Sequence, residues 1–386
     1  MFEQKHNCHL RRVPRLWPDV CLPSCLCCWV RALSSVQAGI RGARRLHRFA
    51  LLGVITSLAV AGVRAQEPAT EIGLEVVREI EIHGDVLVGE VTALDVARNG
   101  DILLTDAIGR VVLLFDSTGV VIERLDATPC DPGFVMSPTG AWFVGRELIL
   151  LKSNGLGHLF DRSGECVGGF VKSFWFPKYI GTTYDYDGFI GLDPWSDGGR
   201  HPDLRVISTD GQVLTSFPLP VRESFPNLVS RVEGGGIVVA DDTLYHASVG
   251  TPAINVVTLG GELIRSIDVR PSGFRPVAAD VSPRSSSATD FRELRDALAE
   301  ATTVKQLLRF DQDRLFISFV GRGGYRYAIV NRNGTIEASH VSRDVRYLFA
   351  FRSGIGYQVV QDPVDDKGEL PNPRLRLVEL TWEGRR

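Results

Sequence analysis

The stretch Phe115-Asp116-Ser117-Thr118-Gly119 (FDSTG) decides the fold, because its pattern recurs along most of the chain. Each copy places an apolar residue four positions before a glycine, with mostly polar residues between them. A strand that ends in a tight hairpin produces this pattern, and glycine supplies the positive φ that such turns need. The other copies end at Gly164, Gly211, Gly261, Gly334 and Gly384.

The six glycines are separated by 45, 47, 50, 73 and 50 residues. This spacing holds about four strands per repeat, which is the size of a propeller blade. A second cue, a polar turn with an apolar run after it, precedes each hairpin, as in 99–104 (NGDILL) and 235–239 (GGIVV). These runs are rich in β-branched and aromatic residues, as strands should be. The sequence therefore predicts an all-β, six-bladed β-propeller with four-stranded blades.

The two ends of the repeat region complement each other. Almost no chain follows the last hairpin glycine, so the final repeat lacks an outer strand. A strand-like segment at 71–83 (EIGLEVVREIEIH) precedes the first repeat. We expect this N-terminal strand to supply the missing edge and to close the ring.

The segment 99–125 (NGDILLTDAIGRVVLLFDSTGVVIERL) resembles the six-bladed propellers of the NHL-repeat kind. It is similar in particular to the large group of exported bacterial six-bladed propeller proteins, and the resemblance covers roughly residues 70–384. It implies the fold. Propellers host hydrolases, lyases, quinoprotein dehydrogenases and binding scaffolds, so function has to be argued from a site.

Residues 41–65 have the pattern of a signal peptide. Four arginines precede an uncharged run at 49–63 (FALLGVITSLAVAGV), and Val63 and Ala65 stand at the −3 and −1 positions of a cleavage site. A membrane anchor is the alternative, but a 15-residue helix spans roughly 22 Å of a hydrocarbon core of about 30 Å. We expect cleavage after Ala65 and an exported, periplasmic or secreted protein, residues 66–386, with no stable membrane span.

Residues 1–40 hold five of the seven cysteines. Their spacing, C-x3-C-x-C-C, lacks the paired C-x2-C of a zinc site, so we interpret this segment as an extension that is mis-assigned or cleaved. Cys130 and Cys166 remain. An even pair in an exported protein favours a disulfide, with two separate buried thiols as the alternative.

The charge is unevenly distributed. Residues 1–65 carry ten Lys and Arg against two Asp and Glu, whereas the remainder carries 33 basic and 44 acidic side chains. Proteins that bind the phosphate backbone neutralise it with Lys and Arg, so this acidic body argues against a nucleic-acid partner.

The 73-residue spacing contains an insertion at about 272–303. A Pro- and Ser-rich loop opens it, and a short helix follows in which Asp290 and Glu293 form a capping box. Phe291, Leu294 and Leu298 share one face of that helix. The insertion either covers the mouth of the channel or packs on the rim.

Aromatic residues gather where the second repeat passes into the third. Rings of this kind stack on sugars and peptides, and Arg with Trp or Tyr is typical of interface hot spots; packing between blades is the alternative. The candidate ligand-binding residues are Trp175, Tyr184, Tyr186, Trp195, Arg200 and His201.

A metal site in the central channel is the second possibility. Glu90 stands where the first inner strand should begin, and it is similar to the metal-binding glutamate of gluconolactonase-like propellers, although the Gly-Pro that follows there is absent here. Asn154 and Asp241 could complete an oxygen-ligand set for calcium, which would polarise a carbonyl or acidify a water.

The sequence thus favours a binding scaffold for a protein, peptide or glycan of the cell envelope, with no cofactor. The alternative is a calcium-dependent hydrolase or lactonase. The nucleophile elbow G-x-S-x-G, the P-loop and the H-E-x-x-H motif do not occur in the sequence.

Overall fold

The computed structural model describes residues 63–64, 71–83, 86–126, 128, 130, 136–154, 156–169, 180–182, 188–193, 203–210, 212–218, 234–277, 296–342, 348–362 and 371–383. All the described residues belong to the unit Gly62–Arg386. The predicted extension and most of the predicted signal peptide therefore lie outside the described residues.

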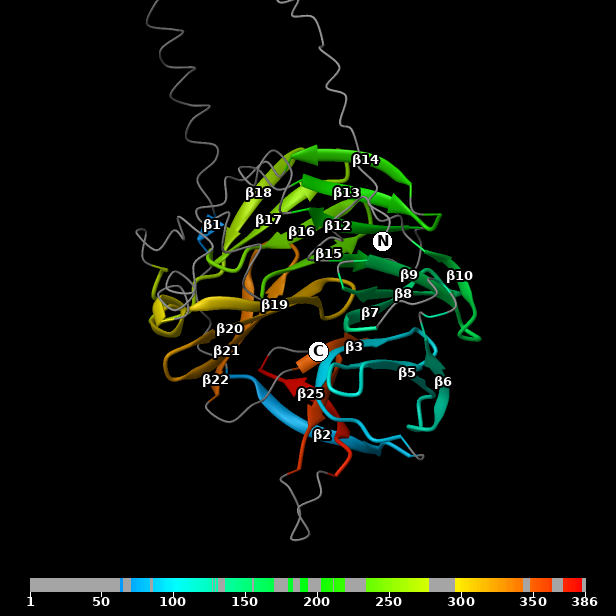
Figure 1. Cartoon of the computed structure of the whole chain (residues 1–386). Coiled ribbons are helices and arrows are strands. Elements are labelled where there is room, and N and C mark those ends of the chain that lie inside the picture. The colour runs from blue at the N-terminus through cyan, green and yellow to red at the C-terminus, as the bar shows by residue number, and fades with distance from the viewer. Residues whose placement is uncertain are drawn as a thin grey trace, which may run out of the picture. The chain divides into compact units, whose positions relative to one another are not determined.

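The protein is a six-bladed β-propeller, as the sequence predicts. In the described part of the chain, 24 of the 25 strands form six blades of four antiparallel strands, and the two-residue β1 adds to the edge of one blade (Figure 1). Blade 1 is β3 (Val91–Val96), β4 (Ile102–Asp106), β5 (Val111–Phe115) and β6 (Val121–Leu125). Blade 2 is β7 (Pro138–Val144), β8 (Leu148–Ser153), β9 (Leu156–Asp161) and β10 (Cys166–Gly169). Blade 3 is β11 (Ile180–Thr182), β12 (Gly188–Asp193), β13 (Asp203–Ser208) and β14 (Val213–Pro218).

The remaining blades follow the same order, with the first strand innermost. Blade 4 is β15 (Gly236–Ala240), β16 (Thr243–Ala247), β17 (Ala253–Thr258) and β18 (Leu263–Asp268), with β1 (Val63–Arg64) parallel to its outer edge. Blade 5 is β19 (Thr303–Arg309), β20 (Arg314–Gly321), β21 (Gly324–Asn331) and β22 (Ile336–Ser342). Blade 6 is β23 (Leu348–Arg352), β24 (Ile355–Val360), β25 (Arg374–Thr381) and, outermost, β2 (Gly73–Glu81). The innermost strands contact each other all the way round the ring.

The middle strands of a blade are buried on both faces, which explains their continuous apolar sequences. In blade 1 every residue of β4 and β5 is buried. Successive side chains point to opposite faces, so Ile102 lies in an apolar cluster with Tyr357 and Leu375 of blade 6, whereas Leu103 lies in a cluster with Phe143 of blade 2. Six apolar clusters result, one at each junction between neighbouring blades.

The hairpin glycines lie where the sequence predicts them. Gly119, Gly164, Gly261 and Gly334 stand between the third and fourth strands of their blades, with φ from +79° to +104°. Only glycine adopts such angles without strain.

In blade 4 the apolar run at 236–240 is the innermost strand, β15, and β16 follows it after a two-residue turn at Asp241 and Asp242. Both strands are buried between blades, so composition alone does not distinguish them.

The N-terminal segment 71–83, here called the strap, contacts three blades. The Ile72 N–H donates to the Ser339 carbonyl of β22 in blade 5 at 3.2 Å, and β2 pairs with β25 of blade 6. The His83 N–H donates to the Gly119 carbonyl of blade 1 at 3.1 Å. Figure 1 shows β2, in blue, along the rim between these blades.

In the predicted insertion, the structure describes a single helical turn at 296–300 directly before β19. Thr303 is the first residue of β19. Its capping-box residues, Asp290 and Glu293, lie outside the described residues.

Candidate ligand-binding face

The two ends of the propeller differ in the length of their connections. Because the strands of a blade are antiparallel, the link from the first to the second strand and the link from the third to the fourth strand lie at the same end of the propeller. Between the strand bounds, these links hold two to five residues. At the other end, the links reach 13 residues at 361–373, 17 at 219–235 and 34 at 269–302. We call these ends the tight-turn face and the long-loop face.

Long loops held on a rigid scaffold are where binding residues concentrate. In blade 1 the loop on the long-loop face that leads into β3 is held by Asp106, at the end of β4. The Asp106 carboxylate accepts the N–H groups of Gly89, Glu90 and Ile108 at 2.8, 3.0 and 3.0 Å. Asp106 is completely buried, with 0% of its surface exposed, so water does not compete for these hydrogen bonds.

A second side chain holds the same loop from blade 6. The Val88 N–H donates to Asn372 Oδ1 at 2.9 Å, and Asn372 Nδ2 donates to the Val86 carbonyl at 2.8 Å. Asn372 lies two residues before β25 begins, so this clamp joins the last blade to the first. The loop at 86–90 is therefore fixed from both sides before any ligand arrives.

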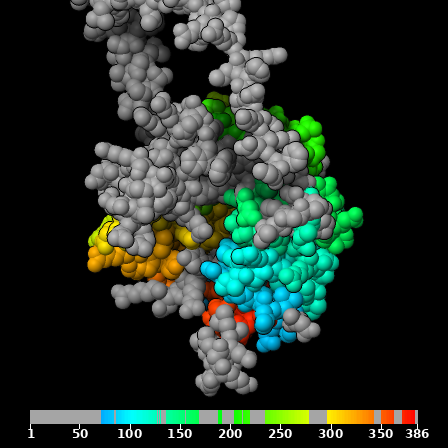
Figure 2. Space-filling model, viewed as in Figure 1, coloured from blue at the N-terminus to red at the C-terminus, as the bar shows by residue number. Residues whose placement is uncertain are grey.

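This fixed loop displays apolar side chains to solvent. Leu87 is 80% exposed, and Ile108, in the β4–β5 turn, is 68% exposed. A Cβ at Gly89 would lie only 2.8 Å from Ile108 Cβ, so Ile108 lies directly against the Gly89 backbone. Glu90 is exposed beside them. We call Leu87, Gly89, Glu90 and Ile108 the blade 1 patch; blade 1, in cyan, is open to the viewer in Figure 2.

Leu87 and Ile108 are not among the binding residues that the sequence predicts. The available signal is an aliphatic residue within a short glycine-containing connection, in 85–90 (DVLVGE) and 106–110 (DAIGR). An apolar residue in a tight turn has no core to enter, whereas the same residue in a strand does.

The predicted metal ligands do not come together. Glu90 and Asn154 lie on the long-loop face, but Asp241 lies on the tight-turn face, in the link between β15 and β16. Among the described residues, no cluster of three or more His, Cys, Asp or Glu side chains could hold a metal ion.

The six predicted ligand-binding residues lie outside the described residues, and the structure leaves them as predictions. They are Trp175, Tyr184, Tyr186, Trp195, Arg200 and His201.

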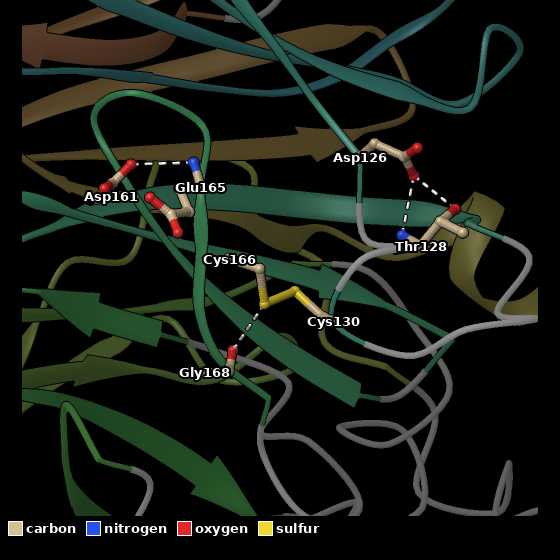
Figure 3. Close-up of a disulfide and its surroundings, with 7 residues drawn as sticks. All are labelled: Asp126, Thr128, Cys130, Asp161, Glu165, Cys166 and Gly168. Atoms are coloured by element: carbon tan, nitrogen blue, oxygen red, sulfur yellow. Dashed lines mark hydrogen bonds between the residues drawn. A yellow bond between two sulfur atoms is a disulfide. The ribbon is translucent and has the colours of Figure 1, made fainter.

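Cys130 and Cys166 form a disulfide, with Cα atoms 5.6 Å apart (Figure 3). It ties the link between blades 1 and 2, residues 126–137, to the outer strand of blade 2. Both cysteines pack on the apolar cluster between these blades. Within the same link, Asp126 accepts the Thr128 N–H at 2.9 Å.

Blade 2 places a lysine near the long-loop face. Lys152 is the fifth residue of β8, and burial lowers the pKa of its amine to about 8. The neighbouring Ser153 hydroxyl accepts the N–H of Ser137, just before β7, at 2.8 Å. Ser153 thus fixes the loop into blade 2 as Asp106 fixes the loop into blade 1.

No protein-family model matches the sequence, and no curated protein matches it. Among solved structures, a member of the DUF4221 family from Bacteroides vulgatus is 11% identical over 81% of this chain and 99% of its own, with a TM-score of 0.56. A protein described as a candidate exported protein from Bacteroides fragilis is 11% identical over 82% of this chain and 99% of its own, with a TM-score of 0.55. A streptogramin B lyase is 12% identical over 80% of this chain and 88% of its own, with a TM-score of 0.47.

The likeness to the two Bacteroides structures shows a shared fold and leaves function to the site. In the part of the chain that the structure describes, no helix is long and apolar enough to cross a membrane.

Proposed function

We propose that this chain is an exported binding protein that uses its long-loop face to hold a protein or peptide of the cell envelope. The observation that carries the proposal is the blade 1 patch: two aliphatic side chains, 80% and 68% exposed, on a loop fixed by Asp106 and Asn372. Large exposed apolar side chains on a preorganised loop lower the entropy that binding costs, because the loop is ordered in advance.

Aliphatic rather than aromatic side chains favour a peptide over a sugar at this patch, since sugars are held by stacking on rings. The predicted aromatic residues of blade 3 would add a stacking surface. Export is supported by the signal-peptide pattern at 41–65, with cleavage after Ala65.

The test is a binding screen of residues 66–386 on arrays of immobilised peptides and glycans. The variant is Leu87→Asp combined with Ile108→Asp, which places two charges on the patch. The matched control is Ile264→Asp combined with Val341→Asp, which changes two aliphatic residues, 54% and 60% exposed, on the outer strands β18 and β22. We expect peptide binding by the wild type and the control, and its loss in the patch variant. Equal binding by all three proteins would overturn the proposal.

A further inference from the structure

Three arginines gather on the long-loop face, where blade 5 meets the link from blade 4. Arg275 lies in the link at 269–302, Arg322 in the turn between β20 and β21, and Arg326 near the start of β21. The chain after residue 65 is acidic overall, with 33 basic and 44 acidic side chains, so this concentration of positive charge is local.

Contacts to Thr302, directly before β19, fix the backbone that carries these arginines. The Arg275 N–H donates to Thr302 Oγ1 at 3.2 Å, and the Thr302 N–H donates to the Arg275 carbonyl at 2.8 Å. The β20–β21 turn lies against the same residue, because a Cβ added at Gly321 would be 3.1 Å from Thr302 Oγ1. The link and the turn therefore meet at Thr302.

Glu300 neutralises only part of this charge. Its carboxylate lies 3.0 Å from Arg322 Nη1 and 3.9 Å from Arg275 Nη1. All three side chains are largely exposed, so water and salt weaken these ion pairs. With Arg326, three guanidinium groups stand against this one carboxylate, which leaves two positive charges among the four side chains.

Arg326 differs from the other two arginines because it is half-buried and has no ion-pair or hydrogen-bond partner among the described residues. It shares a face of β21 with Ala328 and Val330, which lie in the apolar cluster between blades 4 and 5. Its guanidinium ends beside the turn at 271–274, since a Cβ added at Gly273 would lie 3.8 Å from Arg326 Nη2. A partly buried charge is costly without a partner, so this guanidinium indicates a site for an anion.

We propose that Arg326, with Arg322 and Arg275, binds the oxyanion group of an anionic ligand, a carboxylate or a phosphate, at the junction of blades 4 and 5. A guanidinium group presents its N–H donors in a planar fork that fits both oxyanions, often through two parallel hydrogen bonds. This site is separate from the blade 1 patch, which lies on another blade and presents aliphatic side chains.

The experiment is calorimetric titration of residues 66–386 with inorganic phosphate and, separately, with succinate, at an ionic strength held constant with sodium chloride. The variant is Arg326→Gln. The matched control is Arg98→Gln, which removes the same charge from an exposed residue in the β3–β4 turn on the tight-turn face.

We expect the wild type and the control to bind at least one of the two anions, and Arg326→Gln to raise its dissociation constant about tenfold or more. Binding of phosphate alone assigns a phosphate ligand, and binding of succinate alone assigns a carboxylate. Binding of neither anion by the wild type, or equal affinity in Arg326→Gln, would overturn the proposal.

Stability without the anion separates binding from a structural role of Arg326. In sodium chloride alone, we expect Arg326→Gln to leave the melting temperature unchanged or to raise it, because the variant removes a half-buried charge that lacks a partner. It should also abolish the rise in melting temperature that the anion causes in the wild type. A melting temperature lowered by several degrees in chloride would contradict the proposal. The Leu87→Asp/Ile108→Asp variant should bind the anion as the wild type does, so this test is independent of peptide binding at the blade 1 patch.

Discussion

Arg332 of blade 5 donates from Nη1 to Asp241 Oδ2 of blade 4 at 2.8 Å. Its Nε also donates to the Tyr245 hydroxyl at 3.0 Å, and its remaining contacts are to backbone carbonyls of both blades. Arg162 occupies the same place in the hairpin of blade 2 and reaches Asp101 of blade 1 at 3.5 Å. In both blades an arginine in the turn between the third and fourth strands therefore binds the preceding blade. These contacts lie on the tight-turn face, and we call each of them a clamp.

Replacing Arg332 with Ala should lower the free energy of unfolding by about 1–3 kcal/mol, because Tyr245 and the carbonyls lose a shared donor. Asp241→Asn should cost about 0.5 kcal/mol, since the Asp241 side chain is 72% exposed and its ion pair is screened. Urea unfolding measures both values. The control is Arg322→Ala, which breaks an ion pair to Glu300 whose side chains are 69% and 61% exposed. A loss as large in the control as in Arg332→Ala would contradict the clamp.

The strap should be essential for the folded ring. Ile80 is 3% exposed in the apolar cluster between blades 6 and 1, so Ile80→Ala should cost about 2–4 kcal/mol. Val77, on the same strand, is 57% exposed, and Val77→Ala should change stability by less than about 0.5 kcal/mol. Thermal melting of both variants measures the difference. Equal stability would show that β2 is dispensable.

Loss of the disulfide should destabilise the protein through its unfolded state. The bridge closes a loop between residues 36 positions apart, and a cross-link of this length contributes about 2–4 kcal/mol. Replacing both cysteines with Ser should lower the urea midpoint, and a reductant should lower that of the wild type equally. A reductant that leaves the wild-type midpoint unchanged would contradict this expectation.

His246 should make the protein less stable in mild acid. The side chain is fully buried in β16, and burial lowers its pKa from 6.5 to about 4. Between pH 6.5 and pH 4 the unfolded chain binds a proton that the folded protein does not, so stability falls as the pH falls. The loss reaches about 3 kcal/mol near pH 4 and is absent above pH 6.5. Urea unfolding from pH 8 to pH 4 should show this slope in the wild type and a shallower slope in His246→Leu; identical slopes would argue against it.

Glu90→Gln separates the binding scaffold from the calcium-dependent alternative. Glu90 is exposed, and Asp241 lies on the opposite face, so the melting temperature should not change with this variant, with EDTA or with excess calcium. A melting temperature that rises with calcium in the wild type but not in Glu90→Gln would restore the metal site.

The repeat could be read from the sequence because each blade depends on local chemistry. The hairpin glycines at 119, 164, 261 and 334 need positive φ, and the apolar runs between them need burial on both faces. The strap could be predicted as an outer strand, but its bonds to blades 5 and 1 depend on the closed ring. The end of the propeller at which a turn residue lies depends on the order of the strands in its blade: β15 is innermost, so Asp241 lies on the tight-turn face.

The blade 1 patch depends on long-range contacts that the sequence does not reveal. Asn372 lies 284 residues from Val88, so no local pattern links them. Leu87 and Ile108 are held in exposed positions because Asp106 and Asn372 fix the backbone around them.

The central claim, that the long-loop face binds a peptide through the blade 1 patch, is tested most directly by calorimetric titration. The strongest peptide from the array is titrated into the wild type, the Leu87→Asp/Ile108→Asp variant and the Ile264→Asp/Val341→Asp control, all with matched melting temperatures. We expect the patch variant to bind at least about tenfold more weakly than the wild type and the control to match the wild type. Equal affinity in all three proteins would place the binding site elsewhere and contradict the account.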